Sequence, residues 1–401
     1  MGEKLGGSAL RETGKGSNPS AVLWVVGIAI FVDMLIYGLI VPILPVYAEE
    51  LGASESMIGA LFASYAIALF AATPFWGMLS DRIGRKKPLL WGLLGLAAAT
   101  LLFAFAESFA WLVAARVLQG ISAAATWTAG LALIAEHYSP ETRGRAMGLA
   151  LSGQAAGTLL GPTVGGWLYE LGGYTLPFLC AAGLALLDGI LRVVLLRRTE
   201  ERRLVEKEKG SVWALLRHPA LLVTGGAIAI GAAVPTVLEP TLPLHLHESL
   251  GASPGTVGLL FAVPTLAYGL VAPIIGTLSA RWGHSRTIAA GLLVTALALP
   301  LNAAVDGVWQ QAAALALLGA GMGTVLTPTL PRLALLAERH GNASYGATFA
   351  VYNTAYSAGM MVGPLLGGVL MQGFGLLTAY SVFGAVSLLY ITAFILNRKK
   401  A

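Results

Sequence analysis

The chain has 401 residues, of which 56% are hydrophobic and only 11% are charged, and its formal net charge is +5. Soluble domains carry about 25% charged residues, so this composition excludes a water-soluble protein with a polar coat. The single cysteine, Cys180, excludes an internal disulfide framework and is expected to be a small packing residue in an apolar run.

Twelve stretches of the chain are apolar and long enough to span a bilayer, which takes about 20 residues as a helix. The first 20 residues are rich in glycine, serine and charge and do not resemble a cleavable signal peptide. The sequence therefore predicts an all-α membrane protein of twelve transmembrane helices. In chain order, the predicted spans are 21–48, 57–80, 87–106, 109–135, 143–169, 174–196, 219–245, 255–280, 285–305, 308–333, 344–371 and 375–397.

One connection is longer and more polar than the others. It begins with RRTEERRLVEKEK at Arg197 and divides the chain nearly in half. We therefore expect two six-helix bundles, one on each side of this linker. The predicted units are a tail at 1–20, a first bundle at 21–196, a linker at 197–218, a second bundle at 219–397 and a tail at 398–401.

Lysine and arginine are almost confined to one set of connections. Of the 25 such residues, 24 lie in the two tails and in alternate loops, and the other set of loops has none. Positively charged loops stay on the cytoplasmic side of a membrane, so both termini are expected to be cytoplasmic. The net charge is thus a signal of topology in a lipid bilayer, and a nucleic-acid partner is not expected.

The two halves of the sequence repeat each other. Two six-helix bundles with a substrate site between them form a known transporter architecture. Duplication alone does not show transport, so the argument also needs charged residues inside the membrane. The matching segments, at offsets of 199, 202 and 198 residues, begin at Gly59 and Gly258, at Gly157 and Gly359, and at Val41 and Glu239.

Four ionisable residues lie deep inside the predicted spans: Asp33, Arg116, Asp188 and Glu239. A charge at the middle of a bilayer costs several kcal/mol, so such residues normally line a polar cavity and have a function there. Asp33 is expected to bind a proton or a cation, or else to pair structurally with Arg116. Arg116 should meet a carboxylate, and structural pairing and proton coupling both remain open for it. Asp188 lies four residues before Arg192, and such a pair explains it without a function.

Glu239 is flanked by Pro235 and Pro240. These prolines are expected to break the helix locally and to turn free carbonyl groups toward a cavity. A carboxyl group shielded from water there can take up and release a proton, so we predict that Glu239 couples transport to protons. The alternative is a buried structural hydrogen bond.

The segment GMLSDRIGRKK, which begins at Gly77, is the most specific short motif. Gly77 and Gly84 allow a tight turn and a close approach of helices, and Asp81 can cap a helix or pair with arginines across the bundle interface. The second copy has Ala280 in place of Asp81, so any charged latch would be one-sided. The motif is either a gate or a structural turn. Its candidate gating residues are Gly77, Asp81, Arg82, Gly84 and Arg85.

The fifth span carries the motif GTLLGPTVGG from Gly157. Small residues let membrane helices approach closely, and Pro162 is expected to bend this helix. Gly161 and Pro162 are therefore candidate gating residues, although helix packing must account for part of the motif.

Aromatic residues accompany the acidic ones on the helices expected to line a cavity. Each alone could face lipid or pack in a core, but as a set they suit a cationic, partly apolar ligand through cation–π contacts. They are Tyr37, Tyr65, Trp127, Phe261, Tyr268, Tyr352 and Tyr356.

Taken together, these segments resemble the major facilitator superfamily and, within it, the drug–proton antiporters of twelve helices. The match is most specific to the vesicular monoamine transporters, and it covers nearly the whole chain. It is carried by Asp33 followed by VPILPVY, Arg116 in RVLQG, the stretch from ETRGRAMGLAL through GPTVGGWLYELGGYTLPFL, and LEPTLP at 238–243.

The resemblance implies a protein that exchanges protons for monoamines and is inhibited by reserpine-like or tetrabenazine-like compounds. Asp33 and Glu239 match acidic family residues that handle protons and amine, and Arg116, the third candidate for proton coupling, matches the arginine of the fourth helix. Phe261 and Tyr268 match aromatic residues of the eighth helix. Asn353 stands where the family has an aspartate that pairs with a lysine, which is Tyr65 here. With the aromatic residues on the candidate cavity helices, the expected substrate-binding residues are Asp33, Glu239, Tyr37, Trp127, Phe261, Tyr268, Asn353 and Tyr356.

We therefore expect a plasma-membrane exporter of prokaryotic type that moves organic cations by alternating access as a functional monomer. Broader multidrug efflux of neutral and cationic compounds, proton symport of a metabolite, and a sensor that does not transport remain alternatives. An enzyme is not expected, because the sequence has no metal-spaced cluster, phosphate loop or nucleophile–base set. No cofactor or metal ion is expected.

Overall fold

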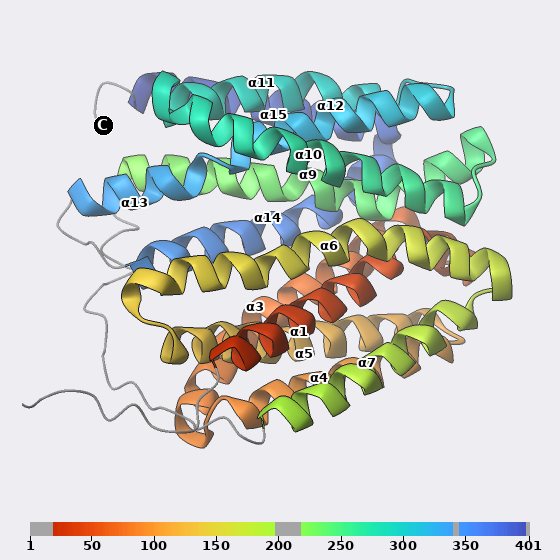
Figure 1. Cartoon of the computed structure of the whole chain (residues 1–401). Helices are drawn as coiled ribbons and strands as arrows, with labels where there is room; N and C mark the ends of the chain where they lie inside the picture. Colours follow the sequence, from red (N-terminus) through yellow and green to blue (C-terminus); the bar gives the residue numbers. More distant parts are fainter. Residues whose placement is uncertain (1–18, 197–217, 340–344, 398–401) are drawn as a thin grey trace, which may run out of the picture.

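The computed structural model describes residues 19–196, 218–339 and 345–397, and every regular element within these ranges is a helix (Figure 1). The helices before the linker are α1 (Pro19–Leu39), α2 (Leu44–Glu50), α3 (Glu55–Ile83), α4 (Lys86–Ala104), α5 (Phe109–His137), α6 (Pro140–Gly172) and α7 (Thr175–Leu196). Those after it are α9 (Pro219–Leu250), α10 (Pro254–Trp282), α11 (His284–Leu301), α12 (Val308–Leu326), α13 (Thr329–Arg339), α14 (Tyr345–Phe374) and α15 (Leu376–Asn397).

Ten described helical segments are long and apolar enough to cross a membrane. Two further helices match predicted spans without meeting the same criterion. α6 has 33 residues but starts with the polar sequence PETRGR, and α15 is apolar over Leu376–Thr392. Each of the twelve predicted spans thus coincides with a described helix or with a pair of them.

Two predicted spans are interrupted. The span predicted at 21–48 is divided into α1 and α2 by a turn at residues 40–43, and the span at 308–333 is divided into α12 and α13. Prolines explain both breaks, because proline lacks the N–H that a helix interior needs and disfavours helical geometry in the residue before it. Pro42 lies in the first break and Pro328 in the second.

The predicted break near Glu239 is wrong. α9 continues for 32 residues with Pro235, Pro240 and Pro243 inside it. Neighbouring helices support proline-containing membrane helices, and here α14 lies against α9. Gly359 and Gly363 bring the two backbones together, since a Cβ atom on Gly363 would lie 2.6 Å from the carbonyl oxygen of Ala233.

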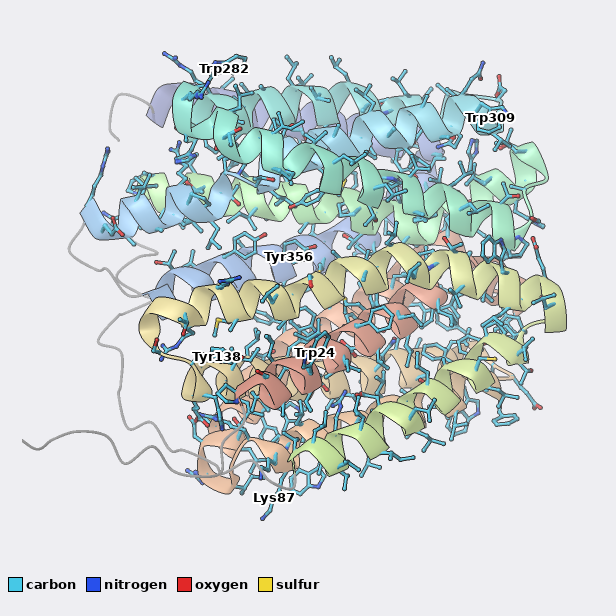
Figure 2. The ribbon with its side chains drawn as sticks, in the orientation of Figure 1. Trp24, Lys87, Tyr138, Trp282, Trp309 and Tyr356 are labelled. Carbon is cyan, nitrogen blue, oxygen red and sulfur yellow. The ribbon has the colours of Figure 1, made fainter. Side chains whose placement is uncertain are left out.

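The helices form two bundles, with α1 to α7 in one and α9 to α15 in the other (Figure 1). We call the end where α7 finishes and α9 starts the linker end, and the opposite end the far end. Lys87 and Trp282 lie toward the linker end and Trp309 lies at the far end (Figure 2). Large apolar side chains such as Trp24 and Leu171 are exposed on the outer surface, as expected of a surface that faces lipid.

The sequence repeat is also a packing repeat. α6 packs against α1 of its own bundle and against α10 of the other, and α14 packs in the same way against α9 and α3. The motif GTLLGPTVGG, predicted in the fifth span, lies on α6 and forms its contact with α1. A Cβ atom on Gly161 would lie 2.7 Å from the carbonyl oxygen of Leu35 and 2.9 Å from the Cα of Gly38. The packing interpretation of this motif is therefore confirmed.

Replacing Gly161 with valine is expected to lower the free energy of unfolding by about 1–3 kcal/mol, because the new side chain must push α6 away from α1. Gly148→Val, in the same helix, is the matched control, since a Cβ atom there meets nothing within 4 Å. Unfolding in detergent measures both variants. Equal losses would show that valine propensity, rather than contact with α1, causes the effect.

Candidate functional site

A cluster of polar and aromatic side chains lies where α1, α3, α5 and α9 meet. α1 supplies two members one turn apart, and α5 supplies three that share one face, as their spacing of three and eleven residues requires. Glu239 is the member from α9. We call this set the central cluster: Asp33, Tyr37, Tyr65, Arg116, Gln119, Trp127 and Glu239.

Asp33 is buried, with 1% of its surface exposed. The indole nitrogen of Trp127 donates a hydrogen bond of 2.8 Å to its Oδ2 atom. This bond joins two residues that the sequence predicted separately, one as an acid and one as an aromatic contact. It leaves Oδ1 as an oxygen that could accept a proton or meet a cation.

Glu239 connects the two bundles. The Tyr37 hydroxyl, on α1, donates a hydrogen bond of 2.6 Å to the Glu239 Oε2 atom, on α9. Glu239 is only partly buried, unlike Asp33. A single hydroxyl group therefore connects one bundle to the acidic residue of the other.

Arg116 does not pair with a carboxylate among the described residues, so that prediction is wrong. Its side chain is fully buried, and its Nη1 atom donates to Gln119 at 3.1 Å. The guanidinium carbon lies 4.5 Å from the ring centre of Phe62, 5.1 Å from that of Tyr37 and 5.7 Å from that of Tyr65. Aromatic faces attract a guanidinium group, so three rings take the place of the expected anion.

The Arg116 guanidinium retains unused donors. Its Nε and Nη2 atoms are buried without a hydrogen-bond partner, as are the Tyr65 hydroxyl and the Gln119 amide nitrogen. Buried polar groups are normally satisfied, so each exception calls for an explanation. The cluster can therefore bind a further acceptor, such as a carboxylate that moves or an oxygen of a ligand.

The other predicted substrate residues lie in the second bundle and form separate groups. Tyr268 and Tyr356 pack against the same apolar cluster as Tyr352, whose ring is 6.1 Å from that of Tyr356. Tyr356 lies between the two bundles in Figure 2. Phe261 belongs instead to the large apolar core, and Asn353 is exposed on α14.

Sequence reasoning missed several neighbours of the central cluster. Met34, Met360 and Met361 pack against its tyrosines, the last two from α14 of the other bundle. Gln119 was also missed, although its position three residues after Arg116 placed it on the same helix face. Nothing in the local sequence marks the methionines, because methionine is common in apolar helices.

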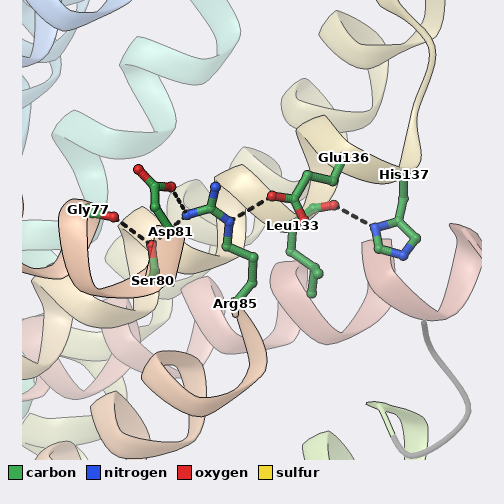
Figure 3. Close-up of polar contacts among 7 residues, drawn as sticks. All are labelled: Gly77, Ser80, Asp81, Arg85, Leu133, Glu136 and His137. Atoms are coloured by element: carbon green, nitrogen blue, oxygen red, sulfur yellow. Dashed lines mark hydrogen bonds and ion pairs between the residues drawn. The ribbon is translucent and has the colours of Figure 1, made fainter. Parts of the chain in front are cut away.

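The loop motif forms a charge network within the first bundle (Figure 3). Arg85 contacts Asp81 at 2.6 Å and Glu136 of α5 at 2.7 Å. Its Nη1 atom also donates to the Ser80 hydroxyl. The predicted pairing of Asp81 across the bundle interface is thus not the arrangement seen. Arg82 follows in the last turn of α3, on the surface.

The two glycines of the motif differ. Gly84 ends α3 with φ of 89°, and its repeat mate Gly283 has φ of 92°, a region that favours glycine. The turn predicted at Gly84 is therefore confirmed, and the second copy has the same turn at Gly283. The close helix approach predicted at Gly77 is wrong, since a Cβ atom there would have its nearest neighbour, Thr128 Cγ2, at 3.8 Å.

The predicted pair of Asp188 and Arg192 is confirmed. Both side chains are buried, and the Arg192 Nε atom donates to the Asp188 Oδ2 atom at 2.8 Å. Arg192 also donates to the backbone oxygen of Leu89 at 2.8 Å, which ties α7 to α4. Arg332 is likewise buried on α13 and donates to Thr224 at 2.9 Å.

The chain is similar in sequence to amine transporters of animal vesicles. It is 33% identical to the chromaffin granule amine transporter of Rattus norvegicus over 85% of the chain, and it spans 66% of that protein. It is 32% identical to the probable vesicular acetylcholine transporter-B of Danio rerio over 99% of the chain and 83% of that protein. The synaptic vesicular amine transporter of Homo sapiens is 31% identical over 83% of the chain, which spans 65% of it.

Solved structures share the fold at lower identity. A bacterial homologue of the human lysosomal transporter Spinster, in an inward-facing and occupied conformation, matches with a TM-score of 0.80 and 16% identity over 96% of this chain and 98% of that one. The human organic anion transporter MFSD10 matches with a TM-score of 0.66 and 21% identity over 94% and 99%. The family model of the Major Facilitator Superfamily matches residues 26–238 and 226–401. The chain is therefore an α-helical membrane transporter that belongs to the major facilitator superfamily.

Proposed function

We propose that this transporter exports organic cations, monoamines or amphipathic amine drugs, in exchange for protons. The observation that carries the proposal is the placement of Asp33 on one bundle and Glu239 on the other, within one cluster. Ionisable residues in a membrane interior are retained for function, and a site between two repeated bundles is where such transporters bind their substrate. The relatives named above as amine transporters support a cationic substrate.

The proposed mechanism is alternating access by twelve spans with both termini in the cytoplasm. A protonated amine enters from the linker end, which the lysine and arginine distribution assigns to the cytoplasm, and binds near the two carboxylates. After the bundles rock, protons that arrive from the far end neutralise the carboxylates and release the amine. Proton and amine compete for the same negative charge, so the inward flow of one drives the outward flow of the other.

The surroundings of the carboxylates support an amine with an aromatic or apolar body. Tyr37 and Trp127 lie beside them, Tyr356 and Tyr268 form a second aromatic group on the other bundle, and Asn353 and Phe261 are on the same helices as these. Aromatic faces attract ammonium groups, and the same rings offer apolar surface to the aromatic or apolar body of the amine. We further propose a functional monomer in the plasma membrane that reserpine-like or tetrabenazine-like compounds inhibit.

Transport into proteoliposomes tests this function. A panel of serotonin-like amines, quaternary dyes and neutral drugs is offered with and without a proton gradient. Antiport predicts that an amine added outside accumulates in the lumen when the lumen is more acidic than the outside. Accumulation with the opposite gradient would indicate symport, and no uptake or counterflow of any compound would contradict transport of these classes.

Broader multidrug efflux is the second candidate, and the methionines favour it. Met34, Met360 and Met361 add flexible, polarizable side chains to the central cluster, and methionine-rich surfaces adapt to ligands of different shape. Comparable proton-driven transport of amines and neutral drugs in the panel would support this candidate over an amine exporter.

Changing Tyr37 to phenylalanine is expected to tighten amine binding. The hydroxyl occupies the Glu239 carboxylate, and a hydrogen bond to a charged group contributes about 1.5–3 kcal/mol, so its removal favours the competing ammonium by at least about tenfold. Titration with a fluorescent amine measures the dissociation constant. Tyr65→Phe is the matched control, because the Tyr65 hydroxyl has no partner to lose. Weaker binding in Tyr37→Phe alone would mean that the hydroxyl instead contacts the amine.

A further inference from the structure

The seam between the bundles has the same construction on both sides. On one side, Gly258 of α10 lies against the backbone of Pro162 of α6, and on the other, Gly59 of α3 lies against the backbone of Pro364 of α14. These four positions are related by the offsets of 199 and 202 residues that relate the two halves of the sequence. The Thr163 hydroxyl adds a hydrogen bond of 3.2 Å to the Gly258 carbonyl on the first side.

The helices α3 and α10 begin at the far end of this seam, and each has one backbone N–H capped from the other bundle. The Gly255 N–H, at the start of α10, donates to the Glu170 carboxylate of α6 at 3.0 Å. The Ser56 N–H, at the start of α3, donates to the Gln372 side-chain oxygen of α14 at 3.3 Å. Glu170 and Gln372 are 202 residues apart and the two donors are 199 apart, so the caps are equivalent by the repeat.

Each of these two helices is also capped by the serine that directly precedes it. The Ser54 hydroxyl accepts from the Met57 N–H, and the Ser253 hydroxyl accepts from the Thr256 N–H. The first N–H groups of a helix have no partner within it, and a serine cap satisfies one of them. The N–H group one residue earlier, that of Ser56 or Gly255, donates to a side chain of the other bundle, so this hydrogen bond exists only while the two bundles meet at the far end.

We propose that Glu170 and Gln372 are paired latches that hold the far end of the transporter shut, and that both must release for the site to open to that side. The proposal rests on the alternating access proposed above. Glu170 is the stronger latch, because a carboxylate at a helix N-terminus is stabilised by its charge as well as by the hydrogen bond. A Cβ atom on Gly255 would lie within 2.8 Å of this carboxylate, which shows how closely the Glu170 side chain covers the start of α10.

Distances between the bundles test the latches without any substrate. Spin labels are attached to the full-length protein, with Cys180 replaced by serine, at two exposed pairs related by the repeat. Glu107 and Asp306 report on the far end, and Lys87 and Arg286 report on the linker end. Double electron–electron resonance then gives the distribution of distances between the labels, and hence the fraction of the protein that is open at each end.

Glu170→Ala combined with Gln372→Ala is expected to raise the ratio of far-open to far-closed protein. Loss of a helix cap changes an equilibrium about fivefold, so the loss of two independent caps gives about 25-fold. The linker-end distances should shorten in the same samples. Glu248→Ala, which removes another exposed carboxylate at the far end, should change neither distribution.

Two further variants separate a latch from a general loss of stability. Glu170→Gln makes the first cap identical to the second and should shift the ratio less than alanine does. Glu170→Ala alone is the comparison for it, because the glutamine oxygen can still accept from the Gly255 N–H and the alanine cannot. Unchanged distances in the double alanine variant, or equal shifts with Glu170→Gln and Glu170→Ala, would overturn the proposal.

The outcome is independent of the substrate assignment. If the distances respond but no amine is exchanged, the latch proposal is supported and the proposed substrate class is contradicted. If amines are exchanged and the distances do not respond, only the latches fall.

Discussion

Replacing Glu239 with glutamine is expected to reduce proton-driven amine accumulation in proteoliposomes to the level of liposomes without protein. Glutamine has the shape of glutamate, and its carbonyl oxygen can still accept the Tyr37 hydroxyl, so the connection between the bundles should persist. It has neither a negative charge for the ammonium group nor a site that exchanges a proton. The variant therefore tests the chemistry of this carboxyl with little change in packing.

The control for this variant is Glu248→Gln, which changes an exposed carboxylate at the far end of the same helix. It should transport like the unmodified protein. Circular dichroism and elution from a sizing column show whether Glu239→Gln is folded. Full proton-driven accumulation by a folded Glu239→Gln protein would end the assignment of proton coupling to this residue.

The sequence predicted the parts of the molecule that the bilayer itself constrains. Spans need about 20 apolar residues, and charged residues inside them are costly, so both could be recognised without knowledge of the fold. Asp33 and Glu239 were identified in this way, and the structure places both in the central cluster. The pair of Asp188 and Arg192 was found from its spacing alone, because helix geometry brings residues four apart together.

What the sequence could not predict depends on neighbours that are distant in the chain. Pro42 lies in the break between α1 and α2, whereas Pro240 lies inside the continuous helix α9, and nothing in the local sequence distinguishes the two prolines. Arg116 lacks the expected carboxylate because Phe62 and Tyr37, from two other helices, surround the guanidinium with aromatic faces. Composition and spacing show that a buried arginine needs a partner, but they do not show which kind of partner the fold supplies.

The caps at the far end illustrate a further limit. Glu170 and Gln372 resemble any polar residues near the end of a membrane helix, so neither stands out in its own segment. Their equivalence becomes visible only when the repeat offset of 202 residues is combined with the contacts that each makes. In a duplicated transporter, a position is thus best interpreted together with its mate in the other half.

Replacing Arg192 with methionine is expected to lower the free energy of unfolding by about 3–5 kcal/mol, because it leaves the Asp188 carboxylate buried without its partner. Asp188→Leu combined with Arg192→Met should cost much less, since no unpaired charge remains inside. The difference between the single and double variants then measures the penalty of an isolated charge rather than the worth of the pair. Titration with a denaturing detergent gives the free energies of unfolding of the unmodified protein, the single variant and the double variant.

The same double variant determines whether the pair acts in transport. The pair carries no net charge, so removing both residues should change the field at Asp33 less than removing one of them. We therefore expect the double variant to transport nearly as well as the unmodified protein, while Arg192→Met, which exposes Asp33 to an uncompensated carboxylate, loses activity along with stability. A stable double variant without transport would contradict a purely structural role for the pair of Asp188 and Arg192.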